Sequence, residues 1–270
     1  MYQIKFIVIH FIVATIKEAR PLIDFYKLKK NNNSCEFQIF QNNNISLTVS
    51  KIGKVSSALS VSHTFFELGK KKNQIWINFG LAGIKNMDIG KLFLVNKIID
   101  FDSSKLFFPF IKSNFELDHK SCVTYSKPNE KLNDLLSDME SSGFFESSSK
   151  FSSKELIHSL KIISDNESNR IDFNNDQQIY KLIEKKLKNI DQFKNEVVKI
   201  WEEYYEENQK LEKIIKSLIE KLKPTFYQKH ELSKSIKLYY SKYQKFDHNI
   251  LDYSKDAKYN IKLILEKISL

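Results

Sequence analysis

The first 165 residues alternate between short apolar runs and stretches in which apolar residues recur every three or four positions. The runs predict strands and the spaced stretches predict helices. Between two of the runs, Gln41–Asn44 is rich in turn-forming residues and predicts a hairpin. We predict strands at Ile4–Ala14, Cys35–Phe40, Ile45–Ser50, Ile75–Phe79, Lys91–Asp100 and Leu156–Ser164, and helices at Glu18–Leu28, Lys54–Leu68, Asn129–Leu136 and Ser141–Phe151. This alternation is typical of an α/β layered fold.

The pattern changes after Asp165, where a polar connector occupies residues 166–175. Asp176–Leu222 then carries a long apolar stripe at helical spacing, which predicts one amphipathic helix or two. Pro224 interrupts it, and helical spacing resumes over Ser233–Leu265. The sequence therefore predicts an α/β domain over 1–165 and an all-α helical hairpin extension over 166–270.

Composition fits a folded chain with a sizeable core, since 41% of the 270 residues are hydrophobic. The net charge of +10 is spread along the chain: residues 1–165 carry 22 Lys and Arg against 16 Asp and Glu, and residues 166–270 carry 21 against 17. Because no segment forms a concentrated basic stripe, we do not expect nucleic acid as a partner.

The chain has two cysteines, Cys35 and Cys122, outside any CxxC motif. Two free thiols fit a reducing compartment, so we expect a cytoplasmic protein. The apolar run Ile4–Ile16 is too short to span a membrane, and we interpret it as a buried first strand, with a signal anchor as the alternative. The histidines lack metal-binding spacing and no P-loop occurs, so we expect no metal and no cofactor.

Candidate chemistry lies on short motifs that end or follow the predicted strands. Two are glycine turns, Ser50–Ala58 around Gly53 and Asn78–Gly83 around Gly80. The others are Ala14–Leu22 with Glu18, Asp138-Met139-Glu140, and Ile162–Asp165, in which Asp165 follows Ser164. An Asp at the carboxyl end of a buried strand lies where open α/β folds place their chemistry. Taken singly, each glycine is more often only a turn, and Glu18 is more often a solvated acid in a first helical turn.

In their order along residues 4–165, the five motifs resemble those of the purine nucleoside phosphorylase superfamily, and within it the methylthioadenosine/adenosylhomocysteine nucleosidases. The resemblance implies a three-layer mixed-sheet domain that hydrolyses the N-glycosidic bond of a purine nucleoside. A 5′-modified adenosine (methylthioadenosine, adenosylhomocysteine or 5′-deoxyadenosine) would release adenine.

The resemblance also implies roles for single residues. Asp165, beside Ser164, would protonate the purine N7, and Glu18 would act as base on the attacking water. Glu140 would bind the ribose 2′-hydroxyl, with Met139 along the sugar. Lys161 falls where the family has an Arg near that water, and Gly53 and Gly80 lie on the two glycine turns. Different pKa values for the acids would separate these tasks.

Alternatives remain at this stage. Lys51, where the family usually has Gly, could favour phosphate as the nucleophile and hence a phosphorylase. Leu81, where the nucleosidases have Ser, favours a non-catalytic nucleoside-binding or assembly protein. The resemblance further implies a homodimer. The helical extension would add to its interface, bind a protein partner, or pack back on the α/β domain.

Overall fold

The fold is known from a computed structural model that describes residues 9–34, 36–113, 115–129 and 131–269. Residues 4–8 of the predicted first strand, and Cys35, lie outside the described residues. The chain divides into two compact units, residues 1–201 and 202–270. The division falls inside one long helix, later than residue 165, and the functional limits 1–165 and 166–270 stay a prediction.

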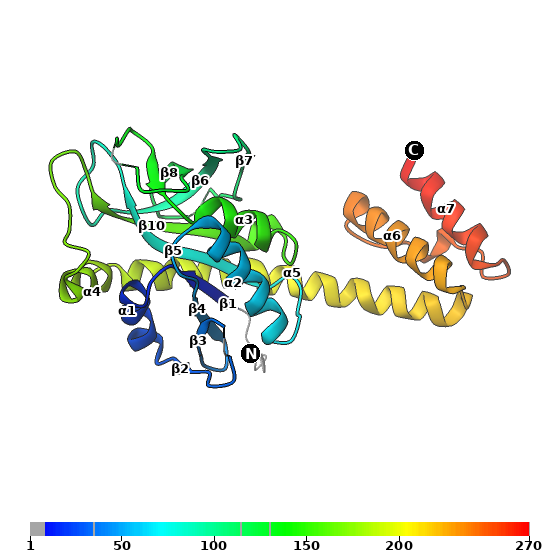
Figure 1. The fold of residues 1–270 in the computed structure, drawn as a ribbon. Coiled ribbons are helices and arrows are strands. Elements are labelled where there is room, and N and C mark those ends of the chain that lie inside the picture. Colours follow the sequence, from blue (N-terminus) through cyan, green and yellow to red (C-terminus); the bar gives the residue numbers. More distant parts are fainter. Residues whose placement is uncertain (1–8, 35, 114, 130, 270) are drawn as a thin grey trace. The chain divides into compact units, whose positions relative to one another are not determined.

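The first unit is a mixed α/β structure (Figure 1). The prediction of an α/β fold followed by helices is confirmed. Its strands are β1 Ile9–Val13, β2 Lys29–Lys30, β3 Gln38–Gln41, β4 Ile45–Val49, β5 Ile75–Gly83, β6 Leu92–Asp100, β7 Leu106–Phe107, β8 His119–Thr124, β9 Leu136–Asp138 and β10 Ile157–Asp165. Its helices are α1 Ile16–Tyr26, α2 Lys54–Glu67, α3 Ser141–Ser148, α4 Asp176–Glu184 and the first part of α5 Leu187–Leu222, with a short 3-10 turn at Lys154–Leu156.

All ten strands join one mixed sheet, in the order β10-β6-β8-β9-β5-β1-β4-β3-β2, with β7 beside β6. Because β10 also pairs with β5, five strands form a closed ring: β5, β10, β6, β8 and β9. The central strands β4, β1, β5 and β10 are mutually parallel. The carboxyl ends of β1, β5 and β10 therefore meet at one edge, which is where the predicted site residues lie.

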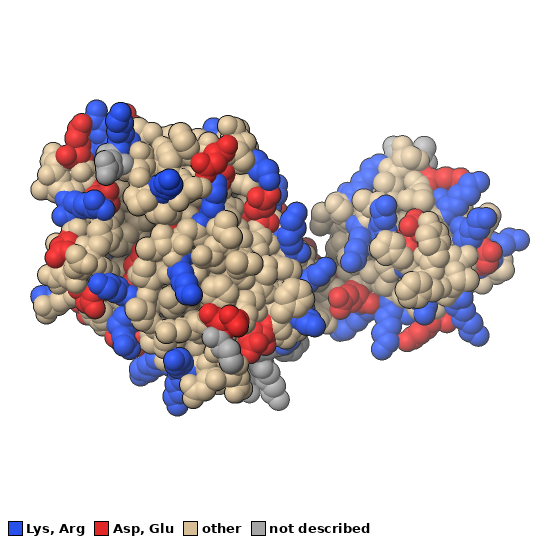
Figure 2. Space-filling model, viewed as in Figure 1, with Lys and Arg blue, Asp and Glu red and all other residues tan. Residues whose placement is uncertain are grey.

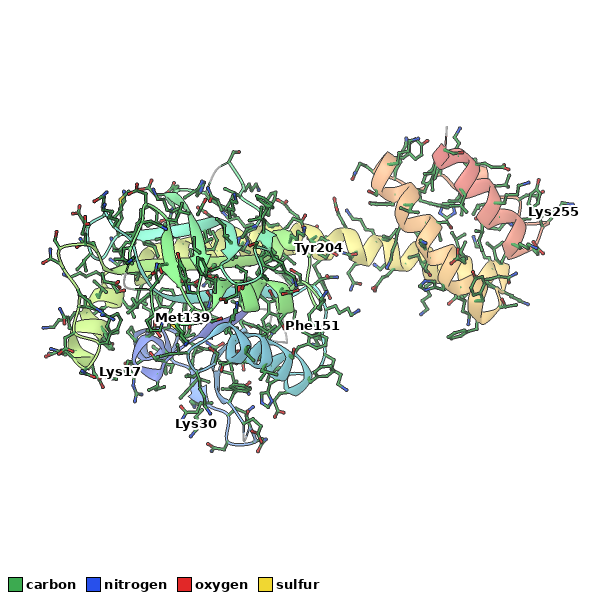
Figure 3. All side chains as sticks on the ribbon, turned by 45° about the horizontal axis from the view of Figure 1, so that its top comes forward. Lys17, Lys30, Met139, Phe151, Tyr204 and Lys255 are labelled. Carbon is green, nitrogen blue, oxygen red and sulfur yellow. The ribbon has the colours of Figure 1, made fainter. Side chains whose placement is uncertain are left out.

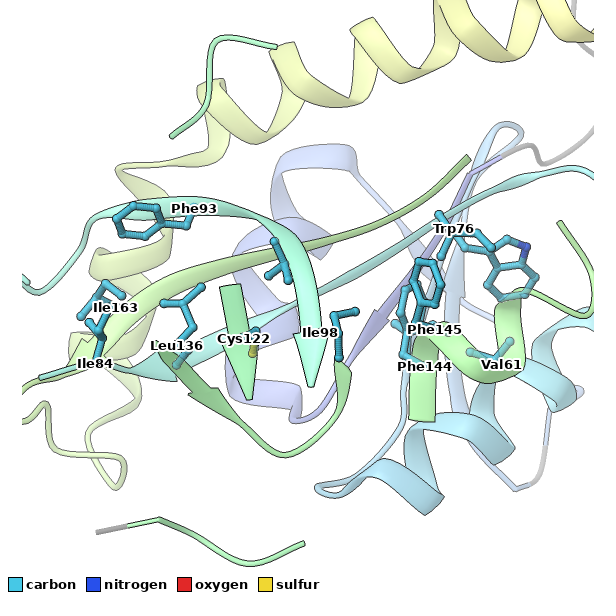
Figure 4. Close-up of a cluster of buried hydrophobic side chains, with 14 of the residues drawn as sticks. Val61, Trp76, Ile84, Phe93, Ile98, Cys122, Leu136, Phe144, Phe145 and Ile163 are labelled. Carbon is cyan, nitrogen blue, oxygen red and sulfur yellow. The ribbon is translucent and has the colours of Figure 1, made fainter. Parts of the chain in front are cut away.

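Alternating side chains of the strands pack on two helical layers. Ile12 and Trp76 join Val61 of α2 and the Phe144–Phe145 pair of α3 in one buried cluster (Figure 4). On the other face, Phe11 stacks on Tyr26 of α1. There, too, His158 contacts Phe193 of α5 edge to face. The two-residue period of the strands thus produces the three layers that the resemblance implied.

Two local predictions are wrong. Gly80–Gly83 is not a turn: β5 continues through it, with Gly80 opposite Lys161 and Gly83 opposite Asp165. Asn129–Leu136 is not a helix. The Asn129 and Asn133 side chains accept hydrogen bonds from the backbone two residues on, which favours turns over helix, and Leu136 begins β9.

The second unit is helical, with its own core. The end of α5 precedes α6 Phe226–Tyr243, a 3-10 turn at His248–Ile250 and α7 Ala257–Ser269. Thr225 forms a capping box with Gln228, so α6 begins directly after Pro224. The predicted single helix Ser233–Leu265 is wrong, because Gln244 adopts a left-handed conformation that ends α6. None of the helices in the described ranges has the length and apolarity to cross a membrane.

Candidate active site

Glu18 is held at the start of α1 by the local sequence. Thr15 and Glu18 form a capping box: the Thr15 Oγ1 and backbone N donate to Glu18 Oε2 over 2.8 and 3.0 Å. The other oxygen, Oε1, accepts from the backbone N of Leu81 in β5 over 3.1 Å. The side chain is 7% exposed. The cap therefore brings the carboxylate to the edge of β5, and Leu81 serves it through its backbone.

Glu140 is held by the start of α2. It is the N-cap residue of α3, and its Oε1 accepts from the backbone N of Gly53, the N-cap residue of α2, over 2.9 Å. Gly53 has φ +108°, a conformation that favours glycine. Nearby Lys51 has φ +66°, so lysine here occupies a conformation that glycine adopts more easily. The glycine turn predicted before α2 is confirmed, and it delivers an N–H donor to a buried acid.

Lys161 comes from the middle of β10 and is fully buried. Its Nζ lies 2.7 Å from Oδ2 of Asp138 at the end of β9, and both side chains are 0% exposed. Gly80 lies opposite Lys161 across the sheet. A Cβ added to Gly80 would lie 3.4 Å from Lys161 Nζ and 3.5 Å from Glu18 Oε1. The missing side chain of Gly80 thus leaves one point that both charged groups face.

Burial and neighbouring charge shift the pKa values of this cluster. Burial is the largest cause for Glu140 and raises its pKa to about 7, although Lys161 acts in the opposite direction. Burial also raises the pKa of Glu18, against the hydrogen bonds from Thr15 and Leu81. Burial acts to lower the pKa of Lys161, but Asp138 and Glu140 hold it above its usual range. The cluster therefore combines two acids that protonate readily with a firmly charged lysine.

Asp165 ends β10 and lies farther along the sheet. Its Oδ1 accepts from Ser164 Oγ over 2.6 Å, and Ser164 Oγ also approaches the carbonyl of Ala82. A Cβ on Gly83 would lie 2.4 Å from Asp165 Oδ2, so a side chain there would displace this carboxylate. Gly80 and Gly83 are three residues apart on β5, which is about 10 Å along a strand. Asp165 therefore lies at the same sheet edge as the Glu18 and Lys161 cluster but does not join it.

The structure groups the predicted residues in two sets. Glu18, Gly80 and Lys161 lie close together. The charges of Lys161 and Glu18 act on Glu140, which accepts a hydrogen bond from Gly53. Asp165 and Ser164 form the second set. Met139 is partly buried and lies near the middle of the α/β unit in Figure 3; its backbone N is 3.4 Å from Glu140 Oε2.

Sequence reasoning missed several residues that hold this cluster. Thr15 was visible as the start of a Thr-x-x-Glu capping box. Asp138 stood in the quoted Asp-Met-Glu motif, but nothing in the sequence pairs it with Lys161. Among the described residues, no three His, Cys, Asp or Glu side chains gather as a metal site would require.

Chemically, the arrangement offers a buried acid near a buried ammonium, a second acid with a pKa near neutrality, and a third at the same sheet edge. Such a set can activate a water, bind hydroxyls and protonate a leaving group. The fold that carries it is that of the nucleoside-cleaving α/β proteins, as structural comparison shows.

No family model matches the chain. It has the fold of the 5′-methylthioadenosine nucleosidase of Arabidopsis thaliana, with a TM-score of 0.58 and 16% identity over 73% of this chain and 96% of that one. A futalosine hydrolase mutant of Helicobacter pylori gives a TM-score of 0.55 and 15% identity, over 70% of this chain and 98% of that one. The MTA/SAH nucleosidase-like fold implied by the sequence motifs is therefore confirmed.

One curated relative is similar in sequence, the aminodeoxyfutalosine nucleosidase of Campylobacter jejuni. It is 31% identical over 132 residues, which is 45% of this chain and 53% of that protein. The chain thus spans about half the length of the curated relative it matches.

Proposed function

We propose that this protein is an N-glycosidase that hydrolyses a purine nucleoside and releases the base. The observation that carries the proposal is the convergence of Glu18 and Lys161 on one point above Gly80, beside the buried Glu140. The fold supports it, since the solved structures named above are of a nucleosidase and a hydrolase. Similarity to nucleosidases favours water over phosphate as the nucleophile.

In the proposed reaction, water adds to C1′ of the ribose as the bond from C1′ to the purine N9 breaks. Glu18 takes a proton from the water, and Asp165 gives a proton to N7 of the departing base, which receives the bonding electron pair. Positive charge develops on the ribose in between. Ionised Glu140 accepts hydrogen bonds from the ribose hydroxyl and stabilises that charge, with Met139 against the sugar.

We further propose a 5′-modified adenosine as substrate. The candidates are methylthioadenosine, adenosylhomocysteine and 5′-deoxyadenosine, together with aminodeoxyfutalosine, after the name of the curated relative. A preference for methylthioadenosine would assign the protein to methionine salvage.

Release of free adenine by the purified full chain, with and without phosphate, tests the function. We expect release without phosphate, loss of activity in Asp165→Asn and a strong decrease in Glu18→Gln. The matched control Glu67→Gln, at an exposed position on α2, should keep wild-type activity. Rates that depend on phosphate would instead favour a phosphorylase. Nucleoside binding without any base release would favour the non-catalytic alternative.

A homodimer is proposed on the exposed face of α2. Val55, Leu59 and Phe66 on α2 recur at helical spacing, and they and Ile52, just before the helix, are each more than half exposed. Val55 and Leu59 also line a surface hollow of about 530 Å³. An apolar face of this kind fits a second copy of the chain. Light scattering should give twice the chain mass for wild type and for the control Phe25→Asp, and the single-chain mass for Val55→Asp.

For the helical unit we propose a protein partner with an acidic surface. Residues 202–270 carry 14 lysines against 11 acids, and lysines spread over the visible face of the unit (Figure 2). On α6, Lys229, Lys234, Lys237 and Lys242 are exposed, whereas its one acid, Glu231, is partly buried.

The full chain should capture an acidic protein in a pull-down, and salt should weaken that binding. Loss of the binding in the Lys234→Glu/Lys237→Glu variant, but not in Lys258→Glu, would support the acidic partner. Capture that nuclease abolishes would contradict it and indicate nucleic acid. The cytoplasmic location stays a prediction, supported by the free thiol of Cys122.

A further inference from the structure

We propose that Asp138 is a positioning residue for the hydrolysis, which keeps Lys161 charged and fixes its ammonium group beside Glu18. This inference rests on the proposed function. Its basis is a buried ion pair between β9 and β10, in which Lys161 Nζ lies 2.7 Å from Asp138 Oδ2. Asp138 has no atom within 4 Å of the point above Gly80 that Glu18 and Lys161 share.

Lys161 needs a counter-charge because its side chain is fully buried. An ammonium group without a partner at such a position would lose its proton rather than stay charged. Four groups act on it: Asp138 from β9, Glu140 from the start of α3, Glu18 from α1 and Cys122 from β8. Burial raises the pKa of the Cys122 thiol and also those of Glu18 and Glu140, whereas the pKa of Asp138 is held below its usual range, although burial acts to raise it, by Lys161 and by the hydrogen bonds it accepts.

Asp138 is fixed by three hydrogen bonds apart from the ion pair. Thr124 Oγ1 donates to Oδ1 over 2.8 Å, and the Ser141 Oγ and backbone N donate to Oδ2 over 2.6 and 2.9 Å. Ser141 is itself within hydrogen-bond distance of Ser159 and Asn78. These bonds restrain the carboxylate in rotation. A lysine ammonium is a point charge on a flexible stem, so a fixed carboxylate is what determines where Nζ lies.

The ammonium group retains donors for the reaction. Lysine has three ammonium donors, and Asp138 at 2.7 Å takes one of them. The point above Gly80 lies 3.4 Å from Nζ and 3.5 Å from Glu18 Oε1. A water oxygen held between Nζ and Oε1 can accept from Lys161 and donate to Glu18. Asp138 therefore positions Lys161, and Lys161 and Glu18 together bind the water to be activated.

The central test is Asp138→Asn, which preserves shape but removes the charge. We expect kcat to fall by about 10²-fold, at the lower end of what a positioned proton-transfer group contributes. KM should change much less, because Asp138 acts through Lys161 and is not among the groups proposed to bind the substrate. Loss of the counter-charge should lower the pKa of Lys161, so the alkaline limb of the kcat profile should move to lower pH. A merely structural role would leave that limb in place.

The matched control is Asp118→Asn, which removes the acid of an exposed ion pair with Lys91 at 3.1 Å. It should keep the wild-type kcat and pH profile. A folded Asp138→Asn enzyme with the wild-type alkaline limb would overturn the inference, whatever its kcat, and so would one with the wild-type kcat.

A second comparison decides the matter if Asp138→Asn fails to fold. Asp138→Asn/Lys161→Met removes both buried charges, and should be as active as Lys161→Met alone if Asp138 acts only through Lys161. Activity at least tenfold below that of Lys161→Met would overturn the inference. Wild-type activity in the same assay distinguishes failure of the proposed function from failure of this inference. If the wild type releases no base, the proposed function is rejected, and the inference with it. If the wild type is active but the variants give one of the overturning results above, only the inference is rejected.

Discussion

The backbone N–H of Gly53 donates to the Glu140 carboxylate over 2.9 Å, which joins the first turn of α2 to the first turn of α3. The first N–H groups of a helix lack partners within the helix and bind anions readily. Glu140 is therefore oriented by the end of a helix and not by another side chain. Three of the predictions below concern this junction.

Gly53→Ala should weaken substrate binding through Glu140. Gly53 has φ +108° and Gly69 has φ +97°, and a Cβ would meet no atom within 4 Å at either position. Both alanine variants should thus lose a similar free energy of unfolding, about 1–2 kcal/mol, from backbone strain. Gly53→Ala alone should raise KM several-fold, because it shifts the donor to Glu140. Equal KM values in the two variants would show that the Gly53 N–H does not matter for binding.

Gly143→Ala should separate α2 from α3. A Cβ on Gly143 would lie 1.9 Å from the carbonyl oxygen of Lys54, an overlap that only a backbone shift can relieve. We expect a loss of about 1–3 kcal/mol in the free energy of unfolding, measured by urea denaturation. Ser147→Ala, which removes a hydrogen bond from α3 to the Ala58 carbonyl, should cost about 1 kcal/mol or less. A Gly143→Ala protein as stable as Ser147→Ala would contradict the close packing.

The sequence pointed to several of these residues, because the order of the motifs along the chain can be compared without knowing their local structure. Glu140 accepts from Gly53 and lies near enough to Glu18 for that charge to act on it, whereas the roles of these residues stay predictions. What the sequence could not supply is geometry between distant strands. Gly80 was predicted to lie in a turn, but pairing with β10 keeps its backbone extended. Its missing side chain leaves room for Lys161 and Glu18.

The missed elements have similar physical causes. β9 has only three residues, and β8 and β9 are strands because they close the ring of β5, β10 and β6. Such tertiary pairing leaves little trace in local apolar spacing. The Asn129–Leu136 stretch has helical spacing, but its asparagine side chains compete for the backbone N–H groups.

Glu140→Gln should be more stable than wild type at neutral pH but not in acid. Folding raises the pKa of Glu140 to about 7, above the value of about 4.5 in the unfolded chain, so the folded state binds more protons between these pH values. The stability that protonated Glu140 contributes is fully present below pH 4.5 and is lost as pH rises through 7. Glutamine does not titrate. The difference in unfolding free energy should grow by about 3 kcal/mol from pH 4.5 to pH 8 in urea titrations. Glu155→Gln, at an exposed site, should show no such trend, and a flat difference for Glu140→Gln would contradict the raised pKa.

Leu218→Ala should loosen the helical unit without affecting catalysis. Leu218 is 0% exposed in the core formed by α5, α6 and α7, whereas Leu238 on α6 is 47% exposed. Truncation of the buried leucine should cost about 2–5 kcal/mol, and truncation of the exposed one about 0.5 kcal/mol or less. Because each unit has its own core, hydrogen exchange should accelerate in α6 and α7 while β5 and β10 keep their protection. Adenine release should stay at the wild-type rate in both variants. Equal acceleration in β5 and β10 would show instead that the two units unfold as one cooperative block.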